Sequence, residues 1–193
     1  MKVTRPPAKH PLPPHAHKVF SGEIFDVYQW EQQLFDGTNA TFEKIKRLDT
    51  VGVVAVTPDQ KLLLCHQEQP GMAPFVETFG GRVDPGEDPF LAAQRELLEE
   101  SGYQSAQWKF WQATQPFEKI DWAIYTFVAQ NCQLVQDQAL EGGEKISVFT
   151  ATFEEFIDYT QQPNFRDAEL TNLVLQALAY PEKMTALKQM LFA

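Results

Sequence analysis

Residues 81–103, with the sequence GRVDPGEDPFLAAQRELLEESGY, constrain the fold more than any other part of the chain. Asp88 is a preferred N-cap residue, and Pro89 suits the first helical turn because it needs no amide partner there. Gly102 stands where a helix would end in a left-handed cap. The segment therefore predicts a helix over residues 88–101 with a defined start and end.

The predicted helix carries three glutamates near its C-terminal end. At about 100° per residue, its apolar residues are expected on one arc, namely Phe90, Leu91, Ala93, Leu97 and Leu98. Glu96, Glu99 and Glu100 are expected on the opposite arc, where they neighbour and repel one another. A bound divalent cation would reverse that repulsion, and carboxylates without Cys or His favour Mg²⁺ or Mn²⁺. A solvated acidic face is the alternative that these glutamates alone leave open.

The overall composition limits the classes of partner. The 193 residues include 26 acidic and 16 basic side chains, a net charge of -10, which disfavours nucleic acid and anionic membranes. No apolar run reaches the roughly 18 residues that a membrane-spanning helix needs, and the N-terminus lacks the apolar region of a secretory signal. Two cysteines are too few for a disulfide framework, so a cytoplasmic location is predicted.

The order of sequence patterns predicts an arm followed by one domain. Residues 1–18 are rich in proline and read as an extended or disordered arm, and residues 19–193 read as a folded domain. A β-hairpin is expected within residues 19–47 because alternating segments flank Asp36-Gly37. Later strands alternate with helices, which predicts an α+β class with a mixed sheet and helices on its faces. The later segments are strands at 50–56, 61–67, 107–112, 122–129 and 145–151, and helices at 153–162, 168–179 and 182–191.

The spacing of the fixed residues in 81–103 is that of the Nudix box. It runs through Gly81, Glu87, Arg95-Glu96-Leu97, Glu99-Glu100 and Gly102. The chain thus resembles the Nudix hydrolase family at every fixed position, with Tyr103 in place of the usual final aliphatic residue. The resemblance implies a Nudix fold, an α/β/α sandwich with a mixed β-sheet, here with an N-terminal β-hairpin extension. It also implies metal-dependent cleavage of a nucleoside diphosphate linked to another moiety.

The same resemblance implies roles for individual residues. Glu96 and Glu100 match the principal metal ligands, and Glu99 matches a carboxylate that often holds an additional ion. The carbonyl of Gly80 matches a further metal ligand, and Arg95 matches the arginine that orients the glutamates. Glu87 in the loop matches the glutamate that ties the loop to the helix. The implied cofactor is Mg²⁺ or Mn²⁺, which neutralises phosphate charge and activates water.

The segments flanking the box resemble those of ADP-ribose and nucleoside diphosphate sugar pyrophosphatases. In this resemblance Glu144 takes the place of a loop glutamate that acts as general base or further metal ligand. Glu77 is expected either to bind substrate or to cap the box loop. Trp30 is expected to pack within the hairpin or to stack on a nucleobase across a dimer. The remaining tryptophans are expected in the core, namely Trp108, Trp111 and Trp122.

Three hypotheses of function follow from this comparison. The first is a Mg²⁺-dependent pyrophosphohydrolase that cleaves ADP-ribose, or a related nucleoside diphosphate sugar, to a nucleoside monophosphate and a sugar phosphate. The second is a hydrolase of dinucleoside polyphosphates, NADH or capped RNA, which stays open because Gln67-Glu68-Gln69 stands where many ADP-ribose enzymes carry an arginine. The third is a non-catalytic Nudix-fold nucleotide sensor, disfavoured because every box carboxylate is present. A small-molecule nucleotide and a homodimer formed through the hairpin are the implied partners.

Overall fold

A mixed β-sheet forms the centre of the molecule. The computed structural model describes residues 1–140 and 142–193. The strand order is β12-β5-β4-β10-β8, with β6 paired to β5, and β4 and β10 are parallel whereas the other pairs are antiparallel. The predicted mixed sheet is therefore confirmed. Its strands are β4 (Thr50–Val56), β5 (Leu62–Glu68), β6 (Phe75–Glu77), β8 (Gln107–Thr114), β10 (Ile124–Gln130) and β12 (Lys145–Ala151).

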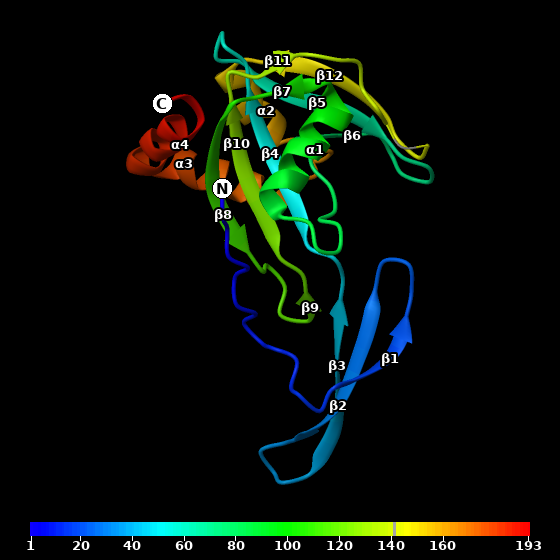
Figure 1. The fold of residues 1–193 in the computed structure, drawn as a ribbon. Coiled ribbons are helices and arrows are strands. Elements are labelled where there is room, and N and C mark those ends of the chain that lie inside the picture. The colour runs from blue at the N-terminus through cyan, green and yellow to red at the C-terminus, as the bar shows by residue number, and fades with distance from the viewer. Residues whose placement is uncertain (141) are drawn as a thin grey trace.

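Helices cover both faces of this sheet, and together they form the core body (Figure 1). Side chains alternate along a strand, so Val53 and Ala55 of β4 pack in the cluster that contains α1, while Val54 and Val56 pack on the other helices. Burial on both faces explains the nearly continuous apolar sequence of β4. The arrangement confirms an α+β sandwich. The helices are α1 (Pro89–Ser101), α2 (Phe153–Thr160), α3 (Ala168–Ala179) and α4 (Pro181–Phe192).

A second sheet, the hairpin sheet, extends away from the core body (Figure 1). Its strand order is β1-β2-β3-β9, and β2 and β3 form the hairpin expected around Asp36-Gly37. Gly37 has a φ of 85°, and the Asp36 carboxylate accepts the Thr38 N–H at 3.0 Å, which closes the turn. The strands are β1 (His17–Ser21), β2 (Asp26–Gln33), β3 (Asn39–Lys46) and β9 (Ile120–Asp121).

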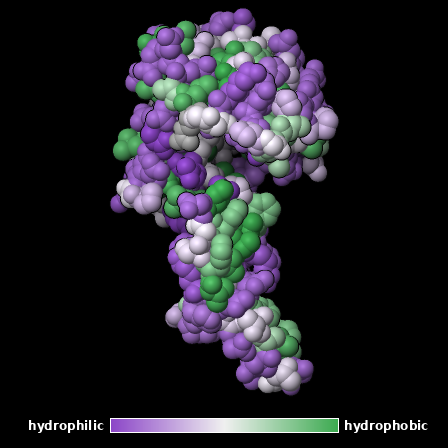
Figure 2. Space-filling view, turned by 90° about the vertical axis from the view of Figure 1, so that its right-hand side faces the viewer, coloured by the Kyte–Doolittle hydropathy of each residue, from purple (hydrophilic) through white to green (hydrophobic). Residues whose placement is uncertain are grey.

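The hairpin sheet leaves large apolar side chains exposed, including Phe20, Ile24 and Phe35. Figure 2 shows apolar side chains gathered along this extension below the core body. A further two-stranded sheet joins β7 (Tyr103–Gln104) and β11 (Gln133–Leu134) at the C-terminal end of α1. Within the described residues, no helix is long and apolar enough to cross a membrane.

Helix α1 begins and ends where its capping residues predict. The Asp88 side chain accepts the Phe90 N–H at 2.8 Å, and Gly102 adopts a φ of 75° while donating to the Leu98 carbonyl. The predicted distribution of side chains around the helix is partly wrong. Leu91 is 56% exposed, whereas Glu100 is only 6% exposed and lies on the buried side of the helix. The carboxylates of the helix therefore do not share one solvated face.

Candidate active site

Glu100 provides a buried carboxylate at the end of α1. Its Oε2 accepts the backbone N–H of Gly80 at 2.8 Å, which joins the helix to the preceding loop. The pKa of Glu100 is raised to about 9, chiefly by burial, with smaller contributions from the negative charges of Glu96, Glu77 and Glu144. Four glutamates from three parts of the chain thus share one electrostatic environment.

The loop that faces α1 needs glycine at two successive positions. A Cβ on Gly81 would lie 2.4 Å from Oε1 of Glu96. Gly80 has a φ of 154°, and a Cβ there would lie 2.2 Å from the Val51 carbonyl oxygen. The Val51 N–H donates to the Gly81 carbonyl at 2.9 Å, so the loop runs along β4. The missing side chains allow the backbone to lie between the central sheet and the helix carboxylates.

Arg95 organises the outer part of this site. Its Nε and Nη2 donate to the Glu87 carboxylate at 3.0 and 2.9 Å, and Nη1 donates to Glu96 at 2.8 Å and Glu99 at 3.2 Å. Nη2 also donates to the Arg82 carbonyl at 3.0 Å. These carboxylates raise the pKa of Arg95, which stays charged. The predicted tie between the box loop and the helix is therefore present, and Glu99 lies on the arginine side of the site.

The donor set of this region fits a hard divalent cation. Glu96 and Glu100 are mostly buried carboxylates of like charge, and only Glu96 pairs with a cation, the Arg95 guanidinium, in the described contacts. No three His, Cys, Asp or Glu side chains of the described residues already surround a single point. Two carboxylates completed by a backbone carbonyl and water oxygens suit Mg²⁺, which usually keeps several waters. The residues present therefore fit the metal that the sequence implies.

Glu144 lies immediately before β12, close enough to influence the pKa values of Glu77, Glu96 and Glu100. The preceding segment is fastened to the end of α1. Gln138 Nε2 donates to the Glu100 carbonyl and, at 3.3 Å, to the Ile146 carbonyl, so one amide links α1 to β12. These bonds hold the chain on either side of the loop that ends at Glu144.

A cavity of about 690 Å³, the Gly80 pocket, adjoins these carboxylates. Glu77, Gly80 and Gly81 line one side of it. Burial raises the pKa of Glu77 to about 7, although the positive charge of Arg166 acts in the opposite direction. The remaining wall combines cationic, aromatic and acidic side chains, among them Arg47, Phe117, Trp122, Arg166 and Asp167.

Arg47 and Trp122 form a part of the Gly80 pocket that the sequence patterns did not predict. The Arg47 guanidinium carbon lies 4.5 Å from the Trp122 ring centroid, and Trp122 stacks on Phe117 with centroids 5.9 Å apart. Nε of Arg47 is buried without a hydrogen-bond partner in the described structure, which is unusual for a buried polar group. The expectation that Trp122 belongs to the core is wrong, because it lines this pocket. No sequence signal separates Arg47 from other basic residues at strand ends.

Trp30 is not brought to this site. Its side chain is 2% exposed within the hairpin sheet, with its ring 6.0 Å from that of Phe42. Its Nε1 donates to Gln32 at 3.3 Å. A buried ring has no open face on which a nucleobase could stack, so within one chain Trp30 serves hairpin packing.

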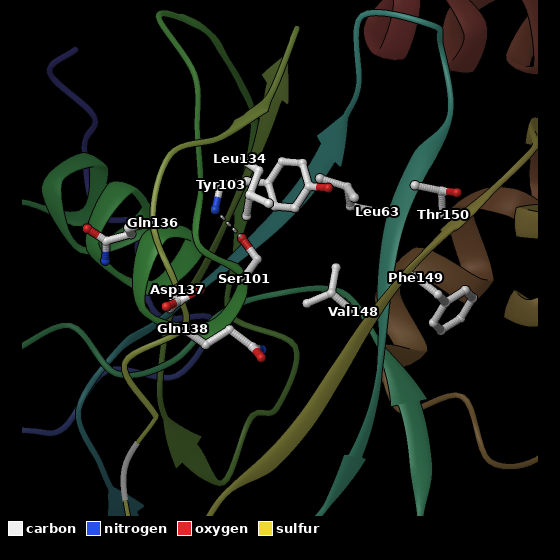
Figure 3. Close-up of a pocket in the computed structure, with 10 residues that line it drawn as sticks. All are labelled: Leu63, Ser101, Tyr103, Leu134, Gln136, Asp137, Gln138, Val148, Phe149 and Thr150. Atoms are coloured by element: carbon white, nitrogen blue, oxygen red, sulfur yellow. Dashed lines mark hydrogen bonds between the residues drawn. The ribbon is translucent and has the colours of Figure 1, made fainter.

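A second cavity of about 490 Å³ lies beside the C-terminal end of α1 (Figure 3). It is lined by Ser101, Tyr103 and Gln138, among others, and shares no lining residue with the Gly80 pocket. The Ser101 hydroxyl accepts the Tyr103 N–H at 3.0 Å, and Gln138 is engaged with main-chain carbonyls. Because none of the box glutamates lines this cavity, it is not the candidate active site.

The fold and the box geometry together define a Nudix hydrolase. The family model of the NUDIX domain matches residues 46–172, and the chain belongs to this family. It is similar to an ADP-ribose pyrophosphatase of Bacillus subtilis (strain 168), with 28% identity over 176 residues that cover 89% of this chain and 94% of that protein. A methanol dehydrogenase activator of Bacillus methanolicus is also 28% identical, over 86% of this chain and 91% of its own length.

A solved structure, that of an ADP compounds hydrolase, confirms the fold. It superposes with a TM-score of 0.72 at 19% identity, covering 93% of this chain and 98% of its own. This likeness confirms the predicted Nudix fold, and the family match confirms the prediction of a Nudix hydrolase.

Proposed function

We propose that this chain hydrolyses ADP-ribose or a related nucleoside diphosphate sugar, with Mg²⁺, to a nucleoside monophosphate and a sugar phosphate. One observation carries the proposal. The loop of Gly80 and Gly81 meets Glu96 and Glu100 and also lines the Gly80 pocket. A diphosphate held beside this loop would have its phosphates at the carboxylates and one of its end groups in the pocket. The similarity to an ADP-ribose pyrophosphatase supports this substrate class.

In this proposal Glu96 and Glu100, with the Gly80 carbonyl, would hold Mg²⁺, and Glu99 would hold an additional ion. When bound, the metal supplies positive charge to the phosphates and lowers the pKa of water. Arg95 keeps Glu96 and Glu99 oriented through its two hydrogen bonds from Nη1. These residues would position the scissile bond. None of them is proposed to accept the proton of the attacking water.

Glu144 is proposed as the general base, because it lies immediately before β12 and its charge acts on both Glu96 and Glu100. It would accept a proton from the water that attacks phosphorus. Arg47, which lines the Gly80 pocket, would donate from its guanidinium to a phosphate oxygen, since this planar group suits phosphate. Glu77 would accept a hydrogen bond from a hydroxyl of the bound substrate, since it lines the same pocket.

The test is a panel of nucleotides assayed for nucleoside monophosphate release. ADP-ribose or a nucleoside diphosphate sugar should give the highest kcat/KM, and chelation should lower the rate at least about 100-fold. Excess Mg²⁺ should restore it. Preferred cleavage of a dinucleoside polyphosphate, NADH or capped RNA would contradict the substrate. Tight ADP-ribose binding without turnover of any nucleotide would favour a sensor.

We further propose that the chain forms a homodimer through the hairpin sheet. This sheet extends from the core body and exposes Phe20, Ile24 and Phe35, a pattern that marks interaction surfaces. A second copy would cover these side chains by self-complementary contact, which is the commonest arrangement of soluble oligomers.

Phe20→Ser should weaken that dimer at least about tenfold, because burying one large apolar side chain contributes roughly 1.5–3 kcal/mol. Phe20 is 58% exposed in the single chain, so its replacement should leave the fold of each subunit intact. Leu134→Ser is the matched control, since Leu134 is 65% exposed on the core body. Sedimentation velocity over a range of concentrations measures both. Equal dimer dissociation constants for the two variants would contradict the hairpin interface.

A further inference from the structure

Arg5 attaches the N-terminal arm, residues 1–16, to the rest of the molecule. Arg5 donates from Nε and Nη2 to the Asp49 carboxylate at 2.7 and 2.9 Å. The same Nη2 donates to Asp121 at 2.8 Å. The Asp49 and Asp121 side chains are only 17% and 15% exposed, so one guanidinium neutralises two largely covered carboxylates.

The two aspartates belong to different segments that both carry walls of the Gly80 pocket. Asp49 lies between Arg47 and Thr50 at the start of β4, and Asp121 immediately precedes Trp122. Asp49 also accepts the Ala123 N–H at 2.8 Å, which closes the junction between the segments. Arg5 therefore holds together the two strand ends from which Arg47 and Trp122 reach the pocket.

Two further hydrogen bonds hold the arm against the same region. The Pro6 carbonyl accepts from Gln115 Nε2 at 2.8 Å, next to Pro116 and Phe117 of the pocket wall. The His10 carbonyl accepts from Nζ of Lys44, a side chain that is almost fully buried in the hairpin sheet. Figure 1 shows the arm running from the core body down along the hairpin sheet, so it spans both parts.

We propose that the arm is a strap that fixes the wall of the Gly80 pocket, with Arg5 as its positioning residue. Arg5 does not line the pocket and acts through Asp49 and Asp121. Without it, two like charges would face each other across the junction, and the segments bearing Arg47 and Trp122 would move apart. The kinetic consequence rests on the proposed function, because it requires the pocket to bind part of the substrate.

The test compares Arg5→Ala with Lys9→Ala, which removes the same charge from an exposed position of the arm. Arg5→Ala should raise KM for the preferred nucleotide about tenfold, since small misplacements of binding groups have large effects. Its kcat should stay within about twofold of wild type, because the box residues keep their contacts. Arg5→Lys should restore KM only in part, since an ammonium cannot reproduce the bidentate pairing with both aspartates.

Hydrogen exchange provides a readout that needs no substrate. Arg5→Ala should speed exchange at the amides of Ala123 and Arg47, which donate to the Asp49 carboxylate and the Asp121 carbonyl, and Lys9→Ala should not. Unchanged exchange at both amides would contradict the proposed strap, whichever nucleotide the enzyme cleaves. Faster exchange with an unchanged KM would support the attachment of the arm through Arg5 but contradict its role in substrate binding. If Arg5→Ala fails to fold, Arg5→Lys supports the same comparison.

Discussion

Glu100→Gln should lower kcat at least about 100-fold, because it removes one of the two buried carboxylates proposed to hold the metal. The folded protein should survive the change. The amide oxygen of the new side chain can still accept the Gly80 N–H that Glu100 accepts at 2.8 Å, and the substitution adds no buried charge. We expect the unfolding free energy of the metal-free protein to stay within about 1 kcal/mol of wild type.

The effect of added Mg²⁺ on thermal stability distinguishes a loss of metal binding from a loss of structure. Saturating metal should raise the melting temperature of the wild type, since a ligand at roughly 100 times its Kd stabilises a protein by about 2.7 kcal/mol. The same addition should shift Glu100→Gln far less. Glu182→Gln, an exposed glutamate on α4, is the matched control and should behave as wild type. Full activity of Glu100→Gln, or equal metal stabilisation in both, would contradict the proposed ligand set.

Gly80→Ala should lower the unfolding free energy by about 3 kcal/mol or more. Its φ of 154° strains any side chain, and the new Cβ would lie 2.2 Å from the Val51 carbonyl oxygen. That contact is to backbone of the central sheet, which cannot rotate away as a side chain can. Displacement of the loop would also move the N–H that Glu100 accepts, so residual folded protein should have little activity.

Gly86→Ala separates the effect of a positive φ from the effect of a steric clash at the new Cβ. Gly86 also has a positive φ, of 84°, but a Cβ there meets nothing within 4 Å. It should lose only about 1–2 kcal/mol, the usual penalty for a left-handed residue. Urea unfolding of both variants measures the difference, which reports the close approach of the loop to β4. Similar losses for the two variants would mean that this close approach has no energetic consequence.

Local signals in the sequence were enough to place most elements. The caps at Asp88 and Gly102 fixed the ends of α1, and Asp36-Gly37 fixed the first hairpin, because caps and turns depend on the conformations of a few adjacent residues. The helix predicted at 168–179 is α3 with the same bounds. The set of box carboxylates was also readable, since it depends on spacing along one helix.

The sequence by itself thus determined which residues are present on α1 and where the helix begins and ends. Only the tertiary structure decided that Glu100 is buried while Leu91 is exposed, because the buried face of a helix is set by the sheet against which it packs. The pocket formed by Arg47 and Trp122, and the docking of Arg5 on Asp49, likewise join segments distant in the chain. Such contacts leave no local pattern, since each depends on how separate strands and the arm are brought together in space.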